Sequence, residues 1–226
     1  CIDVRNVSST EFLTDLFIED SSHNIFWLDY VSPAEIGIQI ADYATLLKKL
    51  NSGDIVRITL NANVASLGKC NDPDKLQTMR LEKLRERIPD EYFPTNITPE
   101  DMTTAKYPLL LLKILKRIAV SCLEDNPPYS PNFMLPLFSS IYADGQQMLT
   151  VTGIVLDSHE LEQKVKEILK GYPHNNFSWE KPCYIEIPPL SVREIMELNK
   201  LLPSDDAEQQ LLKEFPFIFS AKEKKV

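Results

Sequence analysis

Apolar residues follow two spacings along this chain, and stretches with the two spacings alternate. In one kind of stretch they recur every three or four residues, as at Ile36, Ile40 and Tyr43, which is typical of a helix with one buried face. The other kind is a short continuous run, as at 25–30 and 54–60, which is typical of a buried strand. Strands that alternate with helices favour parallel pairing in an α/β fold.

Polar residues mark where the helices begin. Ser8 and Glu11 have the spacing of a capping box, in which each side chain bonds the backbone amide of the other residue. Ser32 and Glu35 repeat this spacing, with Pro33 at the first helical position. Further helices are predicted to begin at Asp72, Thr98, Ser158 and Ser191.

A hairpin closes the predicted sheet. The runs 133–142 and 146–156 have strand character, and Asp-Gly in the short connection between them is a strong turn signal. Gly153, inside the second run, predicts a bulge or a close backbone approach. Two more strands are predicted at 1–7 and 183–187. The sequence therefore predicts a Rossmann-like α/β fold, with a mostly parallel sheet flanked by helices and ending in an antiparallel β-hairpin.

Length and composition limit the classes of protein that this chain can belong to, but they indicate no particular reaction. At 226 residues the chain suits one domain, or one domain with an appended part. Its formal net charge of −9 argues against generic binding to nucleic acid or anionic membranes, and no apolar run approaches the roughly 20 residues that span a bilayer. The four cysteines and three histidines are scattered, which gives no metal signature and predicts reduced thiols in the cytoplasm.

Four segments together resemble the second half of a class I S-adenosylmethionine-dependent methyltransferase. Their order is similar to that of a bacterial group labelled as O-methyltransferases. The segments are Phe26–Pro33, Ile58–Asn63, Tyr142–Thr150 and Tyr184–Ser191, and the likeness extends over about 1–202. The resemblance implies a methyltransferase-type core over 1–157, a C-terminal α/β extension over 158–226, and S-adenosylmethionine as the cofactor.

The resemblance also implies a site for the methyl acceptor. In the family, a strand ends in an acidic or Asp-Pro-Pro-Tyr-like motif beside the methyl group, and the matching stretch here includes Asp29, Tyr30 and Ser32. As catalytic residues, Asp29 would bind or deprotonate the acceptor and Tyr30 would flank the methyl group. Asn61 and Asn63 follow the next strand, and the carboxyl ends of parallel strands face a common crevice. We therefore predict Ser32, Asn61 and Asn63 as substrate-binding residues.

Each of these residues also has a structural interpretation. A carboxylate at a strand end is costly to bury unpaired, so Asp29 would instead accept backbone amides near 32–35. Tyr30 would be a core residue, and asparagine is common in turns, where its side chain replaces a backbone hydrogen bond. The residue types leave both interpretations open.

The cofactor half of the family pattern has no counterpart in the sequence. The family holds its cofactor on a glycine-rich turn, but the closest glycines here, Gly145 and Gly153, are eight residues apart. No acidic residue matches the one that binds the ribose, so no cofactor-binding residue is predicted. If 1–7 is the family's third strand, two interior strands are missing. The chain is then either part of a longer protein, which its start at Cys1 rather than Met favours, or a different, self-sufficient α/β fold.

Three functions are compatible with this pattern. The first is a methyltransferase whose acceptor is unknown. The second is a non-catalytic Rossmann-like module that binds a protein partner or the missing N-terminal segment, which the absent glycine turn favours. The third is a metal-dependent hydrolase or nuclease built on Asp29, although no second acid stands beside it on its strand. No clear nucleic-acid or membrane motif adds to these alternatives.

Overall fold

The structure is a computed structural model that describes residues 2–19, 22–124, 132–172, 174–185, 192–201 and 213. The chain divides into two compact units, Cys1–Tyr184 and Ile185–Val226, and each is described by itself. The first unit holds the predicted core and the helix that follows it. The predicted domains 1–157 and 158–226 stay a prediction.

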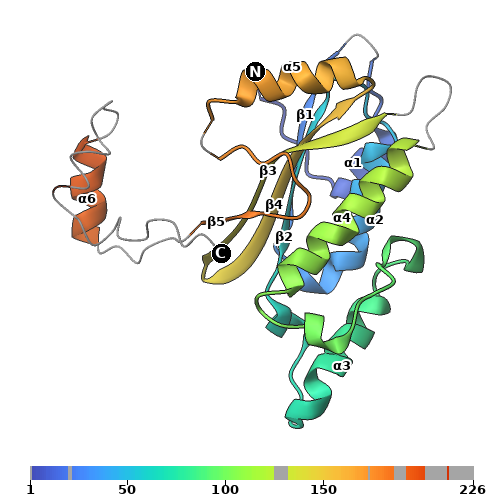
Figure 1. The fold of residues 1–226 in the computed structure, drawn as a ribbon, viewed down its shortest axis with the longest axis vertical. Helices are drawn as coiled ribbons and strands as arrows, with labels where there is room; N and C mark the ends of the chain where they lie inside the picture. Colours follow the sequence, from blue (N-terminus) through green and yellow to red (C-terminus); the bar gives the residue numbers. More distant parts are fainter. Residues whose placement is uncertain are drawn as a thin grey trace. The chain divides into compact units, whose positions relative to one another are not determined.

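One sheet organises the first unit, in the order β1-β2-β4-β3-β5 (Figure 1). Its strands are β1 (Ile25–Asp29), β2 (Ile55–Asn61), β3 (Phe133–Asp144), β4 (Gln146–Leu156) and β5 (Cys183–Ile185). β1 and β2 pair in parallel, whereas β4 is antiparallel to both β2 and β3. β1, β2 and β3 therefore point the same way, with β4 reversed between β2 and β3. The sheet is mixed, and the α/β fold with its antiparallel hairpin is confirmed.

Three helices cover one face of this sheet: α1 (Ser9–Asp15), α2 (Ile36–Leu47) and α4 (Tyr107–Glu124). Alternate residues of β2 supply the buried side of the sheet, namely Val56, Ile58 and Leu60. The three helices and this side of the sheet enclose the main hydrophobic core of the described chain. The alternating sequence pattern predicts helices in the connections between strands.

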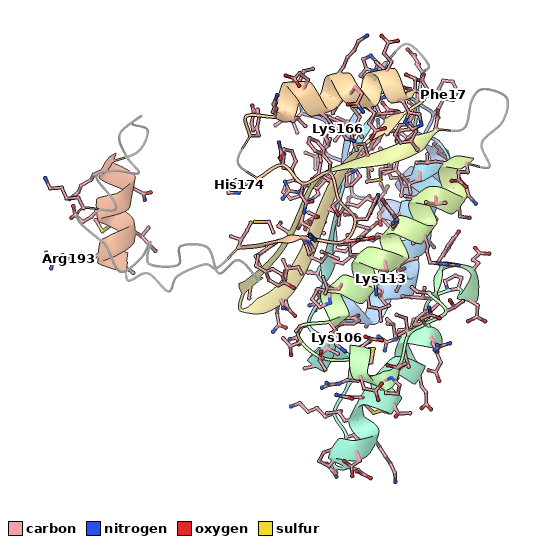
Figure 2. The ribbon with its side chains drawn as sticks, in the orientation of Figure 1. Phe17, Lys106, Lys113, Lys166, His174 and Arg193 are labelled. Carbon is pink, nitrogen blue, oxygen red and sulfur yellow. The ribbon has the colours of Figure 1, made fainter. Side chains whose placement is uncertain are left out.

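Helix α5 (His159–Leu169) packs on a smaller apolar cluster, which includes Leu135 of β3 and Leu156 of β4. Lys166 of α5 (Figure 2) forms an ion pair with Glu162, and its ammonium lies 6.0 Å from the ring centre of Phe177. Near β1 the same face of the sheet is open, since Trp27 is 60% exposed.

Helix α3 (Pro73–Arg85) lies beyond the carboxyl end of β2, away from the sheet (Figure 1). Short 3-10 helices surround it and the strand ends: η1 (Pro33–Glu35), η2 (Val64–Leu67), η3 (Asp90–Tyr92) and η4 (Pro99–Asp101). The second unit contributes the described helix α6 (Val192–Leu201). Within the described part of the chain, no helix has the length and apolar character needed to cross a membrane.

The capping box at the start of α1 is confirmed. The Ser8 hydroxyl accepts the Glu11 amide at 3.2 Å, and the Ser8 amide donates to the Glu11 carboxylate at 2.9 Å. The box predicted at Ser32 is wrong. Ser32 precedes the 3-10 helix η1 without a side-chain cap, and its carbonyl accepts from the Gln39 side chain of α2 at 2.6 Å.

The strand predicted at 1–7 is also wrong over the described residues 2–7, which have no regular secondary structure. Ile2 and Val4 are 93% and 87% exposed. These apolar residues therefore do not pack on the core. The strand predicted at 183–187 is present as β5, and 186–187 lie outside the described residues.

Gly153 confirms the predicted bulge and close approach. It lies opposite Pro136, where β3 has a bulge between Pro136 and Phe138. A methyl group built on Gly153 would lie 2.1 Å from Met134 Cε and 3.1 Å from the Leu135 carbonyl oxygen. The second contact is with backbone, which a side-chain rotation does not relieve.

We therefore expect Gly153→Ala to lower the free energy of unfolding by about 1–3 kcal/mol through overpacking. The measurement is urea denaturation followed by circular dichroism. Gly171→Ala is the matched control, because a methyl group there meets no atom within 4 Å. Equal stability of the two variants would contradict the close approach.

Candidate functional site

The carboxyl ends of β1 and β2 meet at one edge of the sheet. Asp29 pairs in register with Thr59, and the segments that follow the two strands, η1 and η2, contact each other. The Asn61 amide donates to the Val31 carbonyl at 3.3 Å, which joins the two strand ends directly. The fold thus brings together the two stretches that carry all the predicted site residues.

Asp29 places an acidic side chain at this edge. Its side chain is exposed, and it makes no hydrogen bond or ion pair with another described residue. The alternative in which Asp29 accepts backbone amides near 32–35 is therefore not seen. Its carboxylate is free to accept a hydrogen bond from a ligand.

The Tyr30 side chain points instead toward the buried carboxylate of Asp42. Its hydroxyl donates to Asp42 of α2 at 2.9 Å, and Asp42 also accepts from Ser9 at 2.6 Å and Thr10 at 2.8 Å. Burial, together with the Asp42 carboxylate, raises the pKa of the Tyr30 hydroxyl well above its ordinary value. Tyr30 therefore stays a protonated donor that fixes the end of β1.

Asp42 is a site-proximal residue that sequence reasoning missed. It is 2% exposed and lies among the apolar positions of α2, between Ile40 and Tyr43. An acid on the buried face of a helix was the available signal, since a buried carboxylate needs several donors. The sequence did not reveal that those donors come from α1 and the end of β1.

The two asparagines make bonds within the site. Asn61 is buried, and its side-chain oxygen accepts a hydrogen bond from the Asn63 backbone amide at 3.0 Å. Asn63 accepts the Ala65 amide at 3.0 Å, which caps η2, and donates to Gln146 at 2.6 Å. Both shape the loop after β2, and their roles in substrate binding stay predictions.

Ser32 lies at the other side of the same edge. Its carbonyl accepts from the Gln39 amide at 2.6 Å, and its hydroxyl makes no hydrogen bond with another described residue. Gln39 is 3% exposed, and its own side-chain oxygen has no hydrogen-bond partner among the residues that the structure describes. The Ser32 hydroxyl is therefore available to a ligand, and its predicted role is untested.

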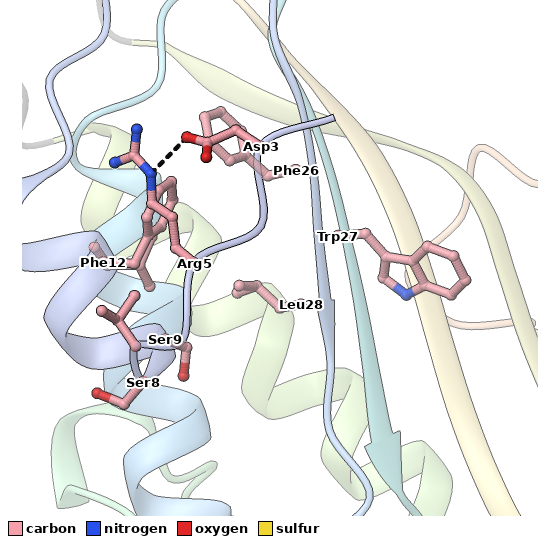
Figure 3. A pocket seen from close by; sticks show the side chains of 10 residues that line it. Asp3, Arg5, Ser8, Ser9, Phe12, Phe26, Trp27 and Leu28 are labelled. Carbon is pink, nitrogen blue, oxygen red and sulfur yellow. Dashed lines mark hydrogen bonds and ion pairs between the residues drawn. The ribbon is translucent and has the colours of Figure 1, made fainter. Parts of the chain in front are cut away.

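A cavity of about 430 Å³ lies against the outer edge of β1 (Figure 3). Its apolar lining includes Phe12, Phe26 and Leu28, and at its rim Arg5 donates to Asp3 at 2.9 Å. Trp27 points to the opposite side of β1, where the Arg57 guanidinium lies 4.8 Å from its ring centre. Among the described residues, no group of three histidine, cysteine or acidic side chains is placed to hold a metal ion.

The fold and this edge define an α/β protein whose polar side chains gather at the carboxyl ends of β1 and β2, which is where open α/β sheets place their ligands. The model of a protein family described as Putative O-methyltransferase matches residues 1–224 of the chain. The chain therefore belongs to this O-methyltransferase family. A search of the curated proteins found none that matches.

The Asp42 network makes a graded prediction about stability. Asp42→Ala should lower the free energy of unfolding by about 2–4 kcal/mol, because three partly exposed hydroxyls lose the charged acceptor that they share. Tyr30→Phe should cost only about 0.5–1.5 kcal/mol, because two donors to Asp42 remain. Asp29→Asn, at an exposed position, should stay within about 0.5 kcal/mol of the natural protein. Urea denaturation of the three variants gives the order, and a cost for Asp29→Asn as large as that for Asp42→Ala would contradict it.

Proposed function

We propose that the protein is a cytoplasmic O-methyltransferase that uses S-adenosylmethionine, and that its acceptor binds at the carboxyl ends of β1 and β2. The observation that carries the proposal is the strand order, with a reversed β4 between β2 and β3, in a chain of this family. The same hairpin closes the sheet of the class I methyltransferases that the sequence resembles. The free carboxylate of Asp29 at the strand ends supports it further.

The residues present fit the acceptor side of such a site and not the cofactor side. A cofactor cradle needs close backbone approach on a glycine-rich turn. The glycines with positive φ in the described chain, Gly53, Gly68 and Gly145, lie in three separate turns. The described glycines therefore form no such cradle.

Asp29 would act on the acceptor hydroxyl. Its carboxylate accepts a hydrogen bond from the hydroxyl and takes up the proton as the oxygen becomes a nucleophile, which is general base catalysis. Tyr30 and Asp42 would hold the end of β1, and Asn61 would hold the neighbouring strand end. Correct placement of the two reacting groups is the largest share the protein contributes.

A second candidate is a non-catalytic module that binds another polypeptide. It is favoured by the free edge of β1. The backbone of Asn24 and Tyr30 bonds β2, so the alternate residues Ile25, Trp27 and Asp29 direct their amides and carbonyls away from the sheet. An unpaired apolar edge is a template for a further strand.

Calorimetric titration with S-adenosylhomocysteine separates the two candidates. We expect the protein to bind one equivalent. Absence of binding would overturn cofactor-dependent transfer and favour the interaction module.

Asp29→Asn tests the acceptor side on its own. We expect methyl transfer from labelled S-adenosylmethionine into cell extract to fall by about 100-fold or more, the range for loss of a general base. Affinity for S-adenosylhomocysteine should stay unchanged. Asp15→Asn, another exposed acid in the first unit, is the matched control. Equal transfer by Asp29→Asn and the natural protein would remove Asp29 from the mechanism.

A further inference from the structure

Two cations of α3 converge on the loop that follows η2. The Arg80 guanidinium donates through Nε to the Gly68 carbonyl at 3.3 Å. Lys83 approaches the same residue, since a methyl group built on Gly68 would lie 2.8 Å from Lys83 Nζ. Gly68 has φ +128°, a conformation that other residues rarely adopt, and the space that a side chain would fill is occupied by the Lys83 ammonium.

Neither cation has an anionic partner among the described residues. Both side chains are half-buried, whereas Lys75 on the same helix is exposed and pairs with Asp72 at 3.3 Å. Arg85 also has a partner, because its guanidinium lies 4.6 Å from the ring centre of Phe93. Partial burial of two neighbouring positive charges is unfavourable without a counter-charge. In a chain of net charge −9, the absence of such a partner at this place is informative.

The cation pair lies next to the candidate acceptor site. η2 begins directly after Asn63, which caps it, and ends at Leu67, just before Gly68. Helix α3 contacts η2, and η2 contacts η1 at the end of β1. Gly68 is therefore connected through η2 to the strand ends that carry Asp29 and Asn61.

We propose that Arg80 and Lys83, together with the Gly68 loop, bind a phosphate group on the acceptor. The guanidinium offers its remaining donors in a planar fork and the ammonium is a compact point charge, a combination suited to a phosphate oxyanion. Because Gly68 has no side chain, the Lys83 ammonium has room beside the residue to which Arg80 is bonded. This inference deepens the proposed function and rests on it for the identity of the ligand as an acceptor.

The test is calorimetric titration of inorganic pyrophosphate at low ionic strength, in chloride buffer. The natural protein should bind it, and Lys83→Met should bind about tenfold or more weakly, the loss expected for a charge-assisted hydrogen bond. Lys75→Met is the matched control and should bind as the natural protein does. Methionine keeps the apolar stem of lysine, so the variant loses the charge and little packing.

Thermal unfolding supplies a second readout. A cation kept for a ligand does not stabilise the free protein, so Lys83→Met should unfold at the same or a higher temperature than the natural protein. Failure of the natural protein to bind pyrophosphate, or equal weakening by Lys75→Met, would overturn the inference. A Lys83→Met variant that unfolds earlier and still binds pyrophosphate would also overturn it, because Lys83 would then be structural.

Titration of the same proteins with S-adenosylhomocysteine keeps the two proposals apart. Binding of the cofactor product without pyrophosphate would refute the phosphate site and leave methyl transfer standing. Binding of pyrophosphate without the cofactor product would support the anion site and refute the transfer.

Discussion

The buried carboxylate of Asp42 is the constraint on which the arrangement around β1 depends. Its three hydroxyl donors come from the first turn of α1 and from Tyr30, immediately after β1. A carboxylate that is 2% exposed is tolerated only when its acceptors are satisfied, so α1, α2 and the strand end must be assembled together. Asp29, one residue before Tyr30, is held in place by this assembly while its own side chain stays free.

The reversed strand β4 sets the second constraint, which acts on the faces of the sheet. Insertion of β4 between β2 and β3 gives every strand from β2 to β3 two bonded neighbours and leaves β1 with one. The α1, α2 and α4 face is filled by the main core, and α5 covers the other face only near β3 and β4. The free edge of β1 and the open face beside Trp27 are therefore consequences of topology rather than of local sequence.

Local signals explain most of what the sequence predicted correctly. The predictions that failed depend on contacts between residues far apart in the sequence. The capping box at Ser8 and the Asp-Gly hairpin depend on residues close in sequence, where propensity decides the outcome. The prediction of a strand at 1–7 failed because alternating apolar and polar residues form a strand only where a partner strand is present. In the site, the sequence placed Asp29 and Asn61 at neighbouring strand ends, but Asp42 was missed because its donors lie up to 33 residues away.

The acceptor edge and helix α3 are linked through η2, which contacts both η1 and α3. The two places carry opposite charges. Asp29 is an exposed carboxylate that would repel an anionic ligand near it, which is useful only if the anion is held elsewhere. Arg80 and Lys83 supply that second point at the Gly68 loop, with η2 and the Asn63 cap as the spacer between them. A ligand with a phosphate at one end and a hydroxyl at the other satisfies both ends. A ligand without the phosphate leaves two half-buried cations uncompensated, so the fold selects against it.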